Sequence, residues 1–174
     1  MISLNVGCGG RPKDRASFQG DVRIDVRHFP AVNFIGDVEE LPFRPKSFDR
    51  IYCFEVLEHL VAPLVALTEM SKVLADNGEI DITIPNVWFW HKIYRWITGK
   101  HYPYDMPDHK QVWDLYEFER LIYLTDLAIE AVQFLNWYPR HRTYWIERLL
   151  PDCLSHTHTA IKLRKKDCGE VLYE

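Results

Sequence analysis

The sequence has no long apolar run and no large excess of charge of either sign. Its 174 residues include 21 Lys and Arg against 25 Asp and Glu, for a formal net charge of −4. A chain without a basic bias gives no electrostatic reason to expect nucleic acid as a partner. No stretch approaches the roughly 20 apolar residues of a membrane-spanning helix, and the first residues have the pattern of a strand rather than of a signal peptide. We therefore expect a cytoplasmic protein.

Cysteine is also scarce, and no two cysteines form a C-x-x-C pair. This excludes a disulfide scaffold and favours free thiols in a reducing compartment. His156 and His158 lie two apart, but no matched acidic or cysteine partner is evident beyond Cys153, so we expect no metal site. The four cysteines are Cys8, Cys53, Cys153 and Cys168.

Aromatic residues are abundant, at 14% of the chain, and many fall between Trp88 and Trp145. The length suits one domain over 1–174, with 86–113 as an insertion that forms a lid on the acceptor side. Residues 87–97 have helical spacing. Three interpretations stay open for this helix: core packing, which we favour, an aromatic wall for an acceptor such as a sugar, or peripheral contact with a membrane.

Segments with strand patterns alternate with helical patterns or long connections, which indicates a mostly parallel α/β sheet. Buried parallel strands usually read as continuous apolar runs, yet 2–6 and 80–84 alternate apolar and polar residues. One sheet face is therefore expected to be poorly covered, and a homodimer could form through it. The expected strands are 2–6, 22–25, 33–36, 51–54, 80–84, 128–134 and 157–164; helices are expected from Pro63 to about 74 and, capped by Asp114, to about 124.

A glycine-rich turn and two acidic residues follow the first three expected strands. Gly7-Cys8-Gly9 follows the first, Asp25 ends the second, and Asp37 follows the third. Ligands of open α/β sheets bind at the carboxyl ends of the strands, where a glycine turn lets a ligand approach the backbone. Asp25 could accept hydrogen bonds from ribose hydroxyls, or could cap nearby N–H groups. Asp37 could accept from an adenine amino group beside Val38.

These segments closely resemble class I S-adenosyl-L-methionine (SAM)-dependent methyltransferases, and most of all their type 11 family in a short-loop variant. The resemblance implies a Rossmann-like sheet, mostly parallel with an antiparallel last strand, here trimmed of N-terminal helices. It also implies SAM as cofactor. The residues that carry it are Leu4–Gly9, Asp25, Asp37–Phe43, Phe48-Asp49 and Val56–Leu60.

The resemblance also assigns roles. The turn with Cys8 would contact the methionine part of SAM, and Asp25 would bind its ribose. Asp37 and Val38 would hold adenine, while Phe54 and Glu55 would lie beside the cofactor. Because no full helix follows the turn, Arg11 could supply the positive charge that a helix N-terminus normally provides, or could be a solvated loop residue.

Methyl transfer to oxygen or nitrogen also requires loss of a proton, so a base near neutral pKa would help. His109 and His59 are the candidates, although a structural role fits either. We expect a small-molecule or glycan acceptor. The alternative function is a non-catalytic module that binds SAM or S-adenosylhomocysteine (SAH). A nicotinamide-dependent dehydrogenase is disfavoured because Pro12 stands where the third glycine of its motif belongs.

Overall fold

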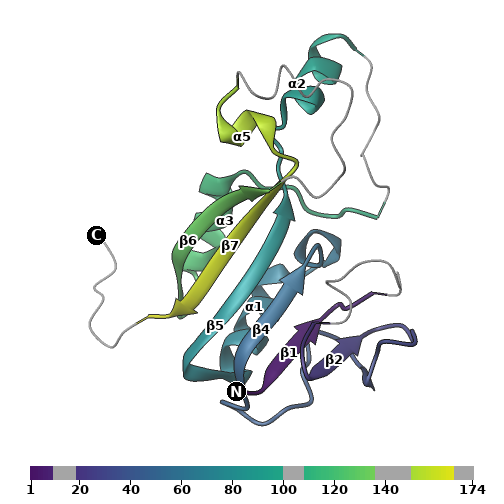
Figure 1. Cartoon of the computed structure of the whole chain (residues 1–174), viewed down its shortest axis with the longest axis vertical. Coiled ribbons are helices and arrows are strands. Elements are labelled where there is room, and N and C mark those ends of the chain that lie inside the picture. Colours follow the sequence, from purple (N-terminus) through teal and green to yellow (C-terminus); the bar gives the residue numbers. More distant parts are fainter. Residues whose placement is uncertain (10–18, 100–107, 136–149, 167–174) are drawn as a thin grey trace.

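The computed structural model describes residues 1–9, 19–99, 108–135 and 150–166. Within these ranges seven strands form one sheet in the order β3-β2-β1-β4-β5-β7-β6 (Figure 1). All neighbours from β3 to β5 are parallel, and β7 is antiparallel to β5 and β6. The predicted fold class is confirmed. The strands are β1 (Ser3–Val6), β2 (Val22–Asp25), β3 (Phe34–Ile35), β4 (Phe48–Phe54), β5 (Leu74–Pro85), β6 (Leu127–Leu135) and β7 (His158–Lys165).

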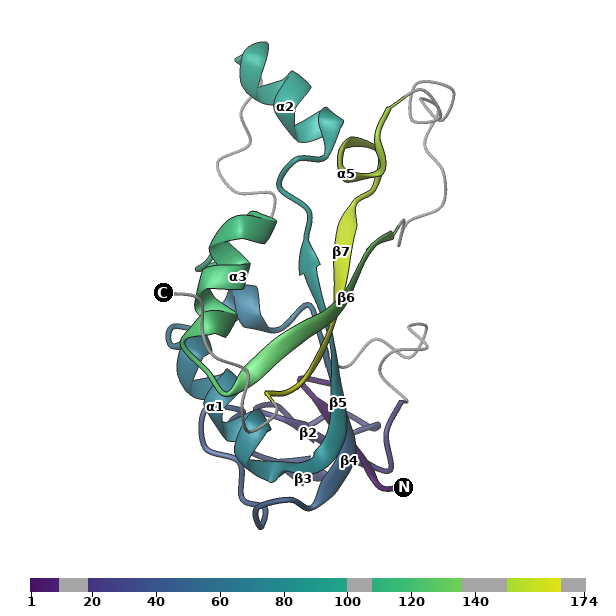
Figure 2. The same cartoon turned by 90° about the vertical axis from the view of Figure 1, so that its left-hand side faces the viewer.

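The described helices that pack on the sheet, α1 (Pro63–Val73) and α3 (Leu115–Tyr123), lie on the same face of it (Figure 2). Pro63 begins α1, where its missing N–H costs nothing. Asp114 caps α3 as predicted, because its Oδ1 accepts a 2.8 Å hydrogen bond from the amide of Glu117. A 3-10 turn, η2 (Leu57–His59), follows β4, and α5 (Asp152–Ser155) precedes β7.

The fifth strand is longer than the sequence pattern predicts. The expected strand covers only residues 80–84, but β5 starts directly after α1, at Leu74, and includes residues 76–78. Phe48 pairs with Leu74 and Arg50 with Glu79, so β5 advances five residues while β4 advances two. Residues 76–78 therefore form an irregularity inside the strand. Such irregularities, like turns, favour glycine and polar residues.

No described helix covers the other face of the sheet (Figure 2), which confirms the expectation of a poorly covered face for this part of the chain. Charged side chains from neighbouring strands pair across it. Arg50 contacts Asp81 at 2.6 Å, and Lys162 contacts Glu79 at 3.1 Å. This face is polar because ion pairs take the place of apolar contacts, whereas the apolar residues of the same strands lie under α1 and α3.

The structure does not support core packing for the aromatic helix, which is α2 (Trp90–Ile97). It stands beyond the carboxyl end of the sheet (Figure 1), and no side chain described on it is buried. Trp96 is 70% exposed and Ile97 71%. Helical periodicity gives an apolar stripe but does not say what covers it, so the favoured interpretation was wrong. No helix among the described residues has the length and apolar character to cross a bilayer.

The described cysteines Cys8, Cys53 and Cys153 are free thiols, as expected, and Cys168 lies outside the described residues. Burial raises the pKa of the Cys8 and Cys53 thiols above the ordinary value. Both are consequently poor nucleophiles near neutral pH, since only the thiolate reacts.

The buried ring of Phe118 should anchor α3 to the sheet. It is fully buried and packs edge-on against Trp113, with ring centroids 5.9 Å apart. Phe118→Ala is expected to lower the free energy of unfolding by about 3–5 kcal/mol in urea titrations, because removal of the buried ring leaves a cavity in the core. Tyr116→Ala is the matched control: this ring on the same helix is 67% exposed, and a change beyond roughly 0.5 kcal/mol is not expected.

Candidate functional site

The glycine turn after β1 has two glycines in the left-handed region, Gly7 at φ +64° and Gly9 at φ +62°. The amide of Gly7 donates to the carbonyl of Ile24 at 2.8 Å, which fixes the turn against β2. A Cβ on Gly7 would lie 2.3 Å from Cγ2 of Val56, whereas a Cβ on Gly9 would meet only the carbonyl of Gly7 at 4.0 Å. Gly7 is thus required by packing, whereas among the described residues no side chain lies within 4 Å of a Cβ at Gly9.

Asp25 lies at the end of β2 and is buried. One carboxylate oxygen accepts from the amide of Gly9 and the other from the amide of Arg27, both at 2.9 Å. Asp25 therefore caps nearby backbone N–H groups, which is one of the two roles considered for it from the sequence. Each carboxylate oxygen has a second lone pair, so ribose hydroxyls could still donate to this side chain. The ribose-binding role remains a prediction.

Asp37 is brought to the same edge because the amide of Gly36 donates to the carbonyl of Asp25 at 3.0 Å. Its side chain is exposed, and its Oδ1 accepts from the amide of Glu39 at 3.0 Å. The neighbouring Val38 is buried and forms an apolar wall. Arg11 lies outside the described residues.

The exit of β4 is strained. Glu55, which follows Phe54, has φ +55°, a region that costs a residue with a side chain about 1–3 kcal/mol. Its amide donates to the carbonyl of Thr83 at 3.2 Å, and its Oε2 lies 3.2 Å from Nε2 of His158. His156 turns elsewhere, with Nδ1 3.0 Å from the carbonyl of Asp152. His156 and His158, which were considered together from the sequence, therefore contact different residues.

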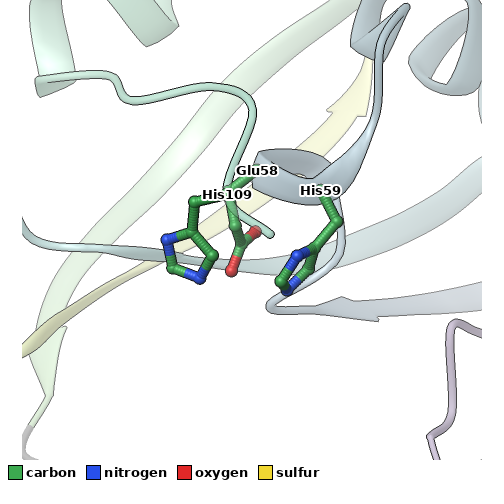
Figure 3. A group of neighbouring side chains, drawn as sticks. All are labelled: Glu58, His59 and His109. Carbon is green, nitrogen blue, oxygen red and sulfur yellow. The ribbon is translucent and has the colours of Figure 1, made fainter. Parts of the chain in front are cut away.

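The two candidate bases meet although 50 positions separate them. The rings of His59 and His109 lie edge to face, with centroids 4.8 Å apart, and the carboxylate of Glu58 lies between them (Figure 3). The amides of Lys110 and Gln111 both donate to the carbonyl of Glu58, at 2.7 and 3.0 Å, and hold this segment on η2. The sequence placed each histidine near the acceptor side but gave no sign that they would be neighbours.

Glu58 is the residue of this cluster that sequence reasoning missed. It is 1% exposed, and beyond the neighbouring carboxyl of Glu55 neither carboxylate oxygen has a hydrogen-bond partner among the described residues. Burial, and then the negative charge of Glu55, raise the pKa of Glu58 to about 8. Burial, and then His59, lower the pKa of His109, so its ring is neutral near pH 7. The available signal was the pair Glu58-His59 between apolar residues in the segment 56–60.

A cavity of about 390 Å³ opens beyond the carboxyl end of β5. Trp88 and Trp113 contribute aromatic walls, and Ile84 and Phe134 add apolar surface from the sheet. Asn86 shapes its rim, because its amide group donates to the carbonyls of Cys153 and His156 at 2.6 and 2.8 Å. The cavity suits a small molecule with an apolar or aromatic body.

The sequence that contains these strand-end residues matches a known protein family. The family model described as a methyltransferase domain matches residues 13–82. The resemblance to class I methyltransferases is confirmed. The matched range contains Asp25, Asp37 and the exit of β4, and it ends within β5.

Solved structures show the same methyltransferase fold. A chain of the complex between the Haloferax volcanii Trm112 methyltransferase activator and a methyltransferase is 14% identical, with TM-score 0.62, covering 97% of this chain and 83% of that one. A SAM-dependent methyltransferase from Archaeoglobus fulgidus is 18% identical, with TM-score 0.62 and coverages of 94% and 85%. The Burkholderia thailandensis 1,6-didemethyltoxoflavin-N1-methyltransferase, with 1,6-didemethyltoxoflavin and S-adenosylhomocysteine bound, is 16% identical, with TM-score 0.61 and coverages of 95% and 72%.

The contact between Gly7 and Val56 should dominate the stability of the glycine turn. Gly9→Ala is expected to cost about 1–2 kcal/mol, for the left-handed backbone alone. Gly7→Ala carries the same backbone cost, and the clash with Val56 should add about 1–3 kcal/mol. Urea unfolding measures both.

A double-mutant cycle separates the clash from the backbone strain. In Gly7→Ala/Val56→Ala the clashing methyl groups are gone, so the double variant should be more stable than the sum of the single losses by at least about 1 kcal/mol. Equal losses from Gly7→Ala and Gly9→Ala, with additive effects in the cycle, would contradict this account.

Proposed function

We propose that the protein transfers the methyl group of SAM to an oxygen or nitrogen atom of a small molecule or glycan. The observation that carries the proposal is the meeting of the glycine turn, Asp25 and Asp37 at neighbouring strand ends, with no described side chain packed against Gly9. The matched methyltransferase family and the shared fold support it.

The residues present fit an adenosyl cofactor. When bound, SAM supplies an electrophilic methyl group on a positively charged sulfur. The turn 7–9 would line the methionine part, with Cys8 among its residues. Asp25 would accept from ribose hydroxyls with its second lone pairs, and Asp37 would accept from the adenine amino group beside Val38. Phe54 and Glu55, at the exit of β4, would bound the site next to the turn.

On the acceptor side, the apolar cavity beyond β5 would hold the body of the acceptor, and residues 86–113 would form its lid. The acceptor atom bonds to the methyl carbon as the carbon–sulfur bond breaks, leaving SAH, and its proton must go to a base. His109 is our candidate because its lowered pKa leaves the ring neutral and able to accept a proton. His59 is the second candidate. A net charge of −4 gives no support to a nucleic-acid acceptor.

The cofactor assignment can be tested at Asp37, whose exposed side chain makes few contacts with the rest of the chain. Asp37→Ala should weaken SAM binding about tenfold to hundredfold in isothermal titration, because a hydrogen bond to a carboxylate is worth about 1.5–3 kcal/mol. Glu40→Ala is the matched control, an exposed acidic residue in the same loop that should leave the affinity unchanged. If neither wild-type protein nor variants bound SAM or SAH, the proposal would fail.

Binding and catalysis are distinguished by a second measurement. Wild-type protein with SAM and a panel of small-molecule and glycan acceptors should release SAH. Tight SAM or SAH binding without any methyl transfer would favour the alternative, a cofactor-binding module. Homodimerisation, contact of 87–97 with a membrane and a cytoplasmic location stay predictions.

A further inference from the structure

Glu58, His59 and His109 each offer a ligand atom, and these atoms lie within 4.8 Å of one another (Figure 3). The three side chains come from two segments that backbone hydrogen bonds lock together, since Lys110 and Gln111 donate to the carbonyl of Glu58. The grouping is therefore built into the fold and does not depend on long flexible side chains meeting at a surface.

Glu58 is the member that calls for a ligand. Its side chain is buried, and beyond the neighbouring carboxyl of Glu55 neither oxygen has a hydrogen-bond partner among the described residues. A buried carboxylate without a partner costs several kcal/mol, so native proteins pair such groups with donors, cations or metal ions. The neighbours on the two sides of Glu58 are imidazoles, which bind metal ions through a neutral nitrogen.

The orientation of His59 is an independent observation. Its Nδ1 lies 3.3 Å from the backbone carbonyl oxygen of Asp108 and 3.3 Å from Oδ2 of the same residue. Donation of Nδ1–H to these oxygens leaves the lone pair on Nε2. Metal-binding histidines usually donate their second ring N–H to a carboxylate or carbonyl in this way, which fixes the tautomer and orients the ring.

We infer that Glu58, His59 and His109 bind one divalent transition-metal ion, with Asp108 orienting His59. Two imidazoles and one carboxylate form a nitrogen–oxygen donor set that suits Zn²⁺ or Mn²⁺, and three protein ligands leave coordination positions for water or another ligand. Ligand atoms around such an ion are about 3.0–3.5 Å apart, so the side chains would close by roughly 1 Å on binding. This inference differs from the expectation drawn from the sequence, which was that the protein has no metal site.

Charges around the cluster favour a cation. The carboxylates of Glu55 and Asp108 and the ammonium group of Lys92 all act on His109. Two carboxylates therefore oppose one ammonium group around the cluster. In the metal-bound protein the ion would occupy the lone pairs of His59 and His109, so the base role proposed above would apply to the metal-free protein. The inference rests on this ligand arrangement and not on methyl transfer, so it can be tested without SAM or an acceptor.

The experiment uses the full chain without a histidine tag, stripped of metal by chelator dialysis, and titrated with ZnCl₂ and separately with MnCl₂. We expect one high-affinity site per chain by calorimetry, a rise in thermal midpoint, and loss of the free Mn²⁺ signal in electron paramagnetic resonance. His109→Ala and Glu58→Gln should each weaken binding at least tenfold, and Asp108→Ala about tenfold through the orientation of His59.

Two variants keep the test decisive. Glu58→Gln preserves shape and removes a buried ionisable group, so it should fold at least as well as wild type while losing the metal. His156→Ala removes a histidine outside the cluster and should bind as wild type does. Absence of one-to-one binding, or equal affinity in wild type, Glu58→Gln and His109→Ala, would overturn the inference. SAM binding would be unaffected by that result, so failure here is distinguishable from failure of the proposed function.

Discussion

The contact between Val56 and Gly7 is the constraint on which the rest of the site depends. The methyl groups of Val56 occupy the space that a Cβ on residue 7 would need, so the exit of β4 can approach the turn after β1 only because residue 7 is glycine. The strained backbone of Glu55 and the turn η2 flank that valine. Val56 thus lies between the glycine turn, where we propose that SAM binds, and the cluster of Glu58, His59 and His109, and we expect a change in either Gly7 or Val56 to disturb both.

Much of the frame is predictable because its signals are local. The alternation of apolar and polar residues marks strand positions within each segment, and β2 begins and ends where the pattern predicts. Pro63 and Asp114 act on the first turn of their own helices, through geometry and a hydrogen bond three residues away. The strand-end acidic residues follow from the same logic, because parallel strands bring their carboxyl ends to one edge.

What the sequence could not predict depends on contacts between distant segments. The apolar stripe of α2 is real, yet only the three-dimensional structure shows that it stands away from the core. His59 and His109 meet because segment 108–111 hydrogen bonds to η2, a contact with no sequence signature. Glu58 was passed over because it stands in an apolar run next to a strand, where the pattern indicates burial and says nothing about the missing donor.

The uncovered sheet face bears on how copies of this chain could associate. Its charged residues already pair within the sheet, Arg50 with Asp81 and Lys162 with Glu79, and each side chain is 21–38% exposed. The centres of stable protein interfaces are depleted in charge. Burying partly exposed ion pairs requires their desolvation, and the attraction within each pair offsets that free-energy cost only in part. This composition weighs against a homodimer through the centre of that face. The same composition explains why the described helices need to cover only one face of the sheet. The strands place their apolar residues beneath α1 and α3 and their charged residues on the opposite face.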